Sequence, residues 1–273
     1  MDEIRIVDTT LRDGNTSLWA HNMTTGMMHP VLRHMDQAGF DAMEFFVSGR
    51  FKKVVREQRD DPWDWVRYGQ KEIKNTQLRY HGGMNSGFTL TPRCIPRLII
   101  ERVVHYGIRV TRLSDPWNDY SVLSKEVAEL KSLGMESVVN IIYSISPRHT
   151  DEYYARKTRE AAALKPYRLC YKDVGGMLTP ERARTLARII LDNAGDVPVE
   201  FHAHCNNGLA PFNVLEVVKQ GIRIVHTSVP PLANGSAQPS IFNVVRNLRA
   251  LGYKPLVNEK VLEPVEQHFR RVA

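Results

Sequence analysis

Apolar runs and segments with the period of a helix alternate along the whole chain. Eight apolar runs have the length and flanking residues of β-strands. They lie at 4–8, 41–46, 77–82, 108–114, 136–143, 167–172, 197–203 and 222–229. Strands that alternate with helices predict a parallel sheet, and a spacing of about thirty residues favours closure into a barrel. We therefore expect an α/β fold, a single (β/α)8 TIM-barrel domain over residues 1–273 with a short extra C-terminal helix.

Capping residues mark the ends of several predicted helices. The clearest helix lies at 179–195, where Thr179 is placed as N-cap, Pro180 fits the first turn and Gly195 follows the last turn. Residues 48–67 predict a loop and a helix after the second strand. Residues 258–273 predict one further helix, which either packs on the barrel or contacts another subunit of a homo-oligomer.

The composition is that of an ordinary globular protein, with 42% hydrophobic and 25% charged residues. No apolar run approaches the roughly 20 residues that span a bilayer. The N-terminal residues have neither the basic nor the apolar region of a signal peptide. The 3 cysteines lack zinc spacing and indicate free thiols in a reducing compartment. We expect a cytoplasmic protein without membrane insertion.

The net charge of +7 is spread along the predicted helices and forms no dense basic tract. A solvated surface explains such a distribution, and it does not favour nucleic-acid binding. A basic chain does attract small anionic substrates.

Several polar residues stand where predicted strands end, which is where barrel enzymes carry their chemistry. Arg12 and Asp13 follow the first strand, and His202 and His204 end the seventh. Side chains on a strand alternate, so His202 and His204 face the same side and can chelate one metal, with Asp13 as an oxygen ligand. The alternative is a structural pair of histidines.

Lys172 ends the sixth strand and has three interpretations. A lysine in a barrel mouth loses hydration, which lowers its pKa and suits a Schiff base. It could also react with CO2 to give a carbamate, which is an oxygen ligand. The third interpretation is a salt bridge to Asp173 or another acid. Arg12 suits a charge clamp on a carboxylate or enolate, or else an ion pair across the barrel.

Five strings resemble a known family. VDTTLRDG (7–14) is similar to the opening signature of the HMG-CoA lyase-like metal-dependent barrels. The other four resemble one branch, the carboxyltransferase domain of biotin-dependent enzymes. They are DPWDWVR (61–67), LCYKDVGGMLTP (169–180), FHAHCNNG (201–208) and SAQPSIFNVV (236–245). That branch includes pyruvate carboxylase, the oxaloacetate decarboxylase α subunit and transcarboxylase, and the resemblance spans nearly the whole chain.

The resemblance implies roles for individual residues. It makes Asp13, His202 and His204 metal ligands and Lys172 a carbamylated ligand with a part in catalysis. Arg12 matches the arginine beside the metal-binding aspartate. Ser236 stands where the family has a threonine that moves a proton between biotin and the enolate.

The chain departs from the family in the substrate pocket. Gly82 replaces the arginine that binds pyruvate, Thr16 replaces a substrate-contacting glutamine, and Phe88 replaces a tyrosine. Losing the arginine removes the main group that would bind a substrate carboxylate. We therefore expect that the substrate is not pyruvate itself. The residues placed to bind substrate instead are Thr16, His81, Asn85 and Arg112.

These features predict an enzyme that forms or breaks a carbon–carbon bond. We expect a divalent-metal-dependent carboxyltransferase or decarboxylase that acts through the enolate of a 2-oxo acid. The expected cofactor is zinc, manganese, cobalt or magnesium. No biotin-carrier segment of the A-M-K-M type is present, so biotin would come on another chain, a biotin-carrier partner. The alternatives are a biotin-independent lyase or aldolase, and a non-catalytic metabolite-binding barrel that acts through a partner.

Overall fold

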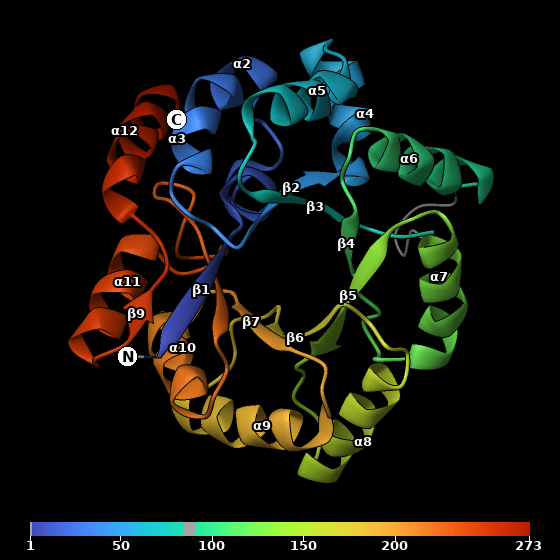
Figure 1. The fold of residues 1–273 in the computed structure, drawn as a ribbon, viewed down its shortest axis with the longest axis vertical. Helices are drawn as coiled ribbons and strands as arrows, with labels where there is room; N and C mark the ends of the chain where they lie inside the picture. Colours follow the sequence, from blue (N-terminus) through green and yellow to red (C-terminus); the bar gives the residue numbers. More distant parts are fainter. Residues whose placement is uncertain (1, 85–90) are drawn as a thin grey trace.

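The computed structural model describes residues 2–84 and 91–273 as a parallel barrel. The strands follow the order β2-β3-β4-β5-β6-β7-β8-β1, and pairing of β1 with β2 closes the ring (Figure 1). They are β1 Glu3–Asp8, β2 Ala42–Val47, β3 Gln77–His81, β4 Val110–Leu113, β5 Glu136–Ile142, β6 Arg168–Asp173, β7 Val199–Ala203 and β8 Ile224–Thr227. The predicted (β/α)8 fold is confirmed, and the strand ends differ from the apolar runs by only one or two residues.

Helices surround the barrel and connect successive strands (Figure 1). The longer ones are α5 Pro62–Glu72, α6 Cys94–His105, α7 Tyr120–Ser132, α8 Asp151–Ala162, α9 Pro180–Asn193, α10 Ala210–Lys219 and α11 Ile241–Ala250. The first connection holds the short helices α1 Asn15–Trp19, α2 Thr25–Met28 and α3 Leu32–Asp36. Among the described residues, no helix has the length and apolar character that crossing a membrane requires.

The predicted cap of α9 is present. The Thr179 hydroxyl accepts a hydrogen bond from the Arg182 amide at 3.2 Å, and Pro180 is the first residue of the helix. Gly195 follows the helix with φ +59°, a left-handed conformation that favours glycine. This local chemistry explains why the boundaries of α9 could be predicted so closely.

The segment after β2 is more helical than predicted. Short turns at Ser48–Arg50 and Val54–Gln58 flank α4 (Phe51–Lys53), and α5 begins only at Pro62. The Asp61 side chain caps α5 by accepting from the Trp63 amide at 2.9 Å. Phe51 and Trp63 in this region pack against the buried core.

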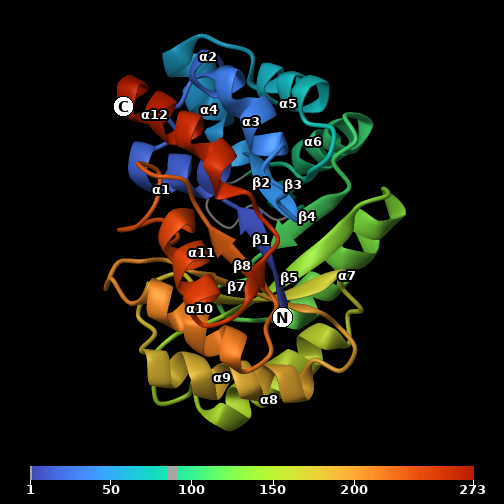
Figure 2. The same cartoon turned by 60° about the vertical axis from the view of Figure 1, so that its left-hand side comes forward.

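The chain end packs against the same barrel. A 3-10 turn at Glu259–Leu262 leads into α12, Glu263–Val272, which lies beside α3 (Figures 1 and 2). Phe269 is buried, and its ring centroid lies 5.9 Å from that of Trp19. A short strand that was not predicted, β9 at Lys254–Pro255, pairs with β1 outside the closed ring. Of the two interpretations of the tail, packing on the barrel is the one that these contacts support.

Charged side chains fill the barrel interior. Arg79 on β3 lies 2.9 Å from Glu200 on β7, and Arg112 on β4 lies 2.6 Å from Glu44 on β2. Neither pair joins neighbouring strands, so both contacts cross the interior, and all four side chains are fully buried. A buried charge is costly unless it is paired and hydrogen-bonded. We call these four residues the ion-pair layer; it lies deeper in the barrel than the strand ends.

Candidate metal centre

Three donor side chains converge at the carboxyl ends of β1 and β7. Asp13 lies in a π-helical turn, Thr10–Gly14, that follows β1, while His202 is in β7 and His204 comes directly after it. Asp13 Oδ2 is 3.2 Å from His202 Nε2 and 3.6 Å from His204 Nε2. The two Nε2 atoms are 3.3 Å apart, and all three residues are buried. Two imidazoles and a carboxylate are a donor set for a divalent metal.

Neighbouring groups orient these donors. His204 Nδ1 lies 2.6 Å from the Ser236 carbonyl oxygen, so Nδ1 donates and Nε2 keeps its lone pair. The Ser17 hydroxyl donates to Asp13 Oδ1 at 2.8 Å. Burial would raise the pKa of Asp13, but the neighbouring charge of Arg12 holds that pKa well below its usual range. An ionised carboxylate therefore faces ring nitrogens, and this arrangement fits a bound cation.

Lys172 is buried at the end of β6, one strand from the histidines. Burial, and next the charge of Arg112, lower its pKa to about 7. In a fraction of the molecules the Lys172 amine is therefore neutral at pH 7, and the neutral amine is the form that reacts with CO2. Lys172 makes no ion pair within residues 2–84 and 91–273. Asp173, the partner considered from the sequence, accepts instead from the Leu178 amide at 2.8 Å.

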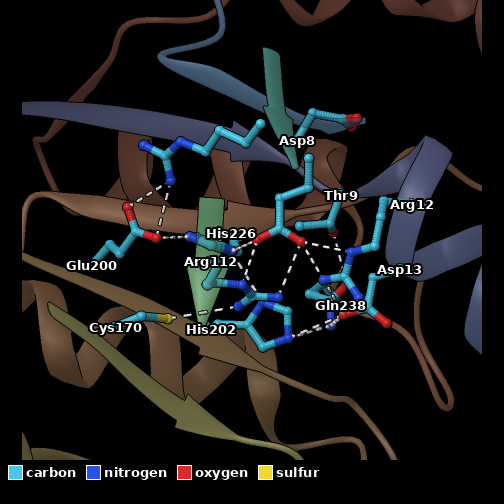
Figure 3. Close-up of polar contacts among 12 residues, drawn as sticks. Asp8, Thr9, Arg12, Asp13, Arg112, Cys170, Glu200, His202, His226 and Gln238 are labelled. Atoms are coloured by element: carbon cyan, nitrogen blue, oxygen red, sulfur yellow. Dashed lines mark hydrogen bonds and ion pairs between the residues drawn. The ribbon is translucent and has the colours of Figure 1, made fainter. Parts of the chain in front are cut away.

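Arg12 connects the metal-ligand candidates to the ion-pair layer. Its Nη2 lies 3.0 Å from Asp13 Oδ2, and its Nε donates to Glu44 Oε2 at 2.8 Å (Figure 3). The side chain is buried. Of the two predicted roles, the structure shows the ion pair across the barrel, and the clamp on an enolate stays a prediction.

Two further predicted residues lie beside the metal-ligand candidates. The Ser236 hydroxyl donates to the Ser17 carbonyl at 2.8 Å, and Ser236 is half-buried. The Thr16 hydroxyl donates to the Arg12 carbonyl at 2.6 Å. The structure brings Ser236 and Thr16 close to Asp13 and His204 through these bonds, while proton transfer and substrate contact stay predictions.

The remaining predicted substrate residues differ in their positions. His81 is half-buried at the end of β3; burial, and next Arg12, lower its pKa well below the usual value, so its ring is neutral. Arg112 lies deeper, with Nη2 3.0 Å from Glu44 Oε2 and Nε 2.6 Å from Oε1. Its guanidinium is bound by Glu44, and a substrate contact by Arg112 stays a prediction. Asn85 and Phe88 lie outside the described residues.

The backbone at Gly82 differs from that of an ordinary residue. Its φ is +138°, and a Cβ at this position would lie 3.0 Å from the Tyr80 hydroxyl oxygen. L-residues rarely adopt this conformation. An arginine at position 82 would therefore be strained in this backbone.

Sequence reasoning assigned no role to Glu44, Glu200, His226 and Gln238. His226 Nδ1 lies 3.0 Å from His202 Nδ1, and Gln238 Nε2 lies 3.2 Å from Asp13 Oδ2 (Figure 3). The sequence does hint at a role for two of them, because Glu44 and Glu200 are charged residues inside apolar strand runs. A charge in such a run implies a buried partner, but the sequence does not show which partner.

Residues 110–268 match the family model described as HMGL-like. The chain belongs to the HMGL-like family. This HMGL-like chain is 31% identical over 271 residues to a pyruvate carboxylase subunit of Methanocaldococcus jannaschii, covering 98% of the chain and 48% of that protein. It is 28% identical to the 2-oxoglutarate carboxylase large subunit of Hydrogenobacter thermophilus, covering 99% of the chain and 42% of that protein. The chain thus spans less than half the length of these relatives.

Solved structures share the same fold. The carboxyl transferase domain of Rhizobium etli pyruvate carboxylase with pyruvate superposes with a TM-score of 0.91 at 22% identity, covering 100% of this chain and 48% of that one. The same domain with pyruvate and biocytin also has a TM-score of 0.91, and covers 99% of this chain and 47% of that one. At this identity, the superposition shows that the HMGL-like chain shares the barrel fold with these proteins.

Proposed function

We propose that this chain is the carboxyl-transferring domain of a biotin-dependent carboxylase, and that residues 1–273 act as one barrel domain. The convergence of Asp13, His202 and His204 at the carboxyl ends of barrel strands carries this proposal. Membership of the HMGL-like family and relatives named as carboxylase subunits support it. The carboxyl carrier would be biotin on a partner, because both relatives are named as subunits of carboxylases.

The proposed substrate class is the 2-oxo acids. Pyruvate and 2-oxoglutarate, named for the two relatives, both carry a carboxylate beside a 2-oxo group. The expectation that pyruvate itself is excluded finds no support in these relatives. We therefore keep pyruvate within the proposed class. Gly82 has no side chain to bind a carboxylate, so other groups would hold it, and neutral His81 is a candidate.

A divalent metal, when bound, would supply positive charge beside the 2-oxo group. Asp13, His202 and His204 would hold it, with Lys172 as a fourth ligand in its carbamate form. Arg12 keeps Asp13 ionised through the 3.0 Å contact and adds positive charge where an enolate develops. The Ser236 hydroxyl, close to His204 through its own carbonyl, would move a proton between the substrate and the carrier.

Decarboxylation of β-carboxylated 2-oxo acids tests this function. The protein would be loaded with zinc, manganese or cobalt and given oxaloacetate or oxalosuccinate, with and without free biotin. We expect decarboxylation that requires metal and increases with biotin. Ser236→Ala should lower the rate about 100-fold or more, and Ser236→Thr should keep most of it. The exposed His105→Ala is the matched control. Protein that binds one metal per chain yet decarboxylates neither acid would refute the proposal.

The pKa of Lys172, about 7, also suits a Schiff-base aldolase that needs no biotin. Borohydride trapping with a 2-oxo acid separates the two functions. Covalent label on Lys172 would favour the aldolase. A carbamate on Lys172 without label would favour the carboxyltransferase.

A further inference from the structure

Glu200 is a buried acceptor at the centre of the barrel. Its Oε2 lies 2.9 Å from Arg79 Nη1 and 3.3 Å from Arg168 Nη1. Its Oε1 lies 3.1 Å from His226 Nε2 (Figure 3). The ion pairs with Arg79 and Arg168 keep this buried carboxylate ionised. An ionised carboxylate has no proton to donate. The proton between Glu200 and His226 therefore belongs to His226 Nε2.

A second contact fixes the proton on His202. Gln238 Oε1 accepts from the Thr9 hydroxyl at 2.7 Å, so Gln238 Nε2 is a donor, and it lies 3.0 Å from His202 Nε2. His202 Nε2 is therefore the acceptor of that bond, and the proton of the His202 ring lies on Nδ1. His202 Nδ1 faces His226 Nδ1 at 3.0 Å, so His202 donates to His226 Nδ1 while His226 Nε2 donates to Glu200.

The consequence reaches the metal-ligand candidates. With its proton on Nδ1, His202 has a lone pair on Nε2, which points at Asp13 Oδ2 and at His204 Nε2. We infer that Glu200 and His226 are positioning residues that fix the tautomer and ring orientation of His202 for metal binding. The hydrogen bonds run from His202 Nδ1 to His226 Nδ1, and from His226 Nε2 to Glu200 Oε1. The part of this inference that concerns affinity rests on the proposed metal site.

The same residues offer a competing arrangement. Cys170, Glu200 and His226 also place one donor atom each within 4.8 Å of one another. Two arginines already contact Glu200, and Arg112 Nη1 lies 3.7 Å from Cys170 Sγ. Three guanidinium groups around this cluster oppose a second cation. Glu200 and His226 therefore act as support for His202 and not as ligands of a second ion, and metal binding should saturate at one ion per chain.

The tautomer can be measured without metal. In protein labelled with 15N-histidine and stripped of metal, long-range 1H–15N spectra should show His202 with its proton on Nδ1. The signals are assigned by their loss in His202→Asn. In His226→Phe, the protonated Nε2 form of His202 should appear. His202 protonated on Nε2 in the unsubstituted protein would overturn the inference, whether or not the protein binds metal.

Cobalt affinity, measured by chelator competition, tests the consequence. We expect His226→Phe to weaken cobalt binding about 10- to 100-fold and to change the visible spectrum of the bound ion. His226→Gln, which retains one donor and one acceptor, should keep more of the affinity than His226→Phe. Cys170→Ala is the matched control, because it alters the same buried layer and leaves the hydrogen-bond chain intact. Equal affinity and equal spectra in His226→Phe and Cys170→Ala would contradict the inference.

Discussion

Arg112 binds both carboxylate oxygens of Glu44 in the barrel interior, with Nε 2.6 Å from Oε1 and Nη2 3.0 Å from Oε2. Both side chains are fully buried. Removing one partner leaves an uncompensated buried charge, which costs several kcal/mol. We expect Arg112→Met to lower the free energy of unfolding by about 3–5 kcal/mol in urea denaturation. Exposed Arg56→Met is the control. A stable Arg112→Met protein with lost substrate binding would instead place Arg112 in the substrate pocket.

The metal ligands can be tested directly. His202→Ala and His204→Ala each remove one of the converging nitrogens. We expect one divalent ion per chain in the unsubstituted protein. Either variant should lose about 100-fold or more in metal affinity, because removing a metal ligand weakens binding at least as much as removing a residue that supports the ligand. Metal content by mass spectrometry after dialysis gives the measurement. His105→Ala should keep its metal. Full metal occupancy in both ligand variants would show that the site lies elsewhere.

Carbamate formation on Lys172 should depend on pH. The pKa of Lys172 is lowered to about 7 by burial and by Arg112, so the neutral amine is scarce well below pH 7 and dominant above it. We expect the 13C signal of a carbamate in metal-free protein given 13C-bicarbonate to rise between about pH 6 and pH 8. Lys172→Met should lack the signal at every pH. A signal that needs pH above about 10 would mean that Lys172 has an ordinary pKa.

The backbone at Gly82 should tolerate no side chain. Gly82→Ala places a Cβ 3.0 Å from the Tyr80 hydroxyl at φ +138°. We expect a loss of about 1–3 kcal/mol in the free energy of unfolding, since an L-residue is strained there. Gly26→Ala is the matched control, because the nearest atom to its Cβ would be 3.8 Å away and its φ is ordinary. Equal stability of the two variants would show that the loop after β3 adapts to a side chain.

Local patterns in the sequence were enough to predict the barrel and the positions of its metal-ligand candidates. Apolar runs marked the strands, and the two-residue period of a strand placed His202 and His204 on one face. Parallel strands end at the same edge of a barrel, so Asp13 after β1 and the histidines of β7 could be expected to meet. They lie 3.2–3.6 Å apart. Each of these inferences depends on residues close in sequence or on a rule of the fold.

Only the tertiary structure decided which buried charges pair. Arg79 and Glu200 are 121 positions apart, and Arg112 and Glu44 are 68 apart. Their contacts depend on how far each side chain reaches across the barrel and on the register of strands that are not neighbours, and neither quantity is encoded locally. The sequence placed Arg112 near the end of a strand and so in the pocket, whereas its long side chain lies against Glu44. The support of His202 by His226 and Glu200 was hidden for the same reason.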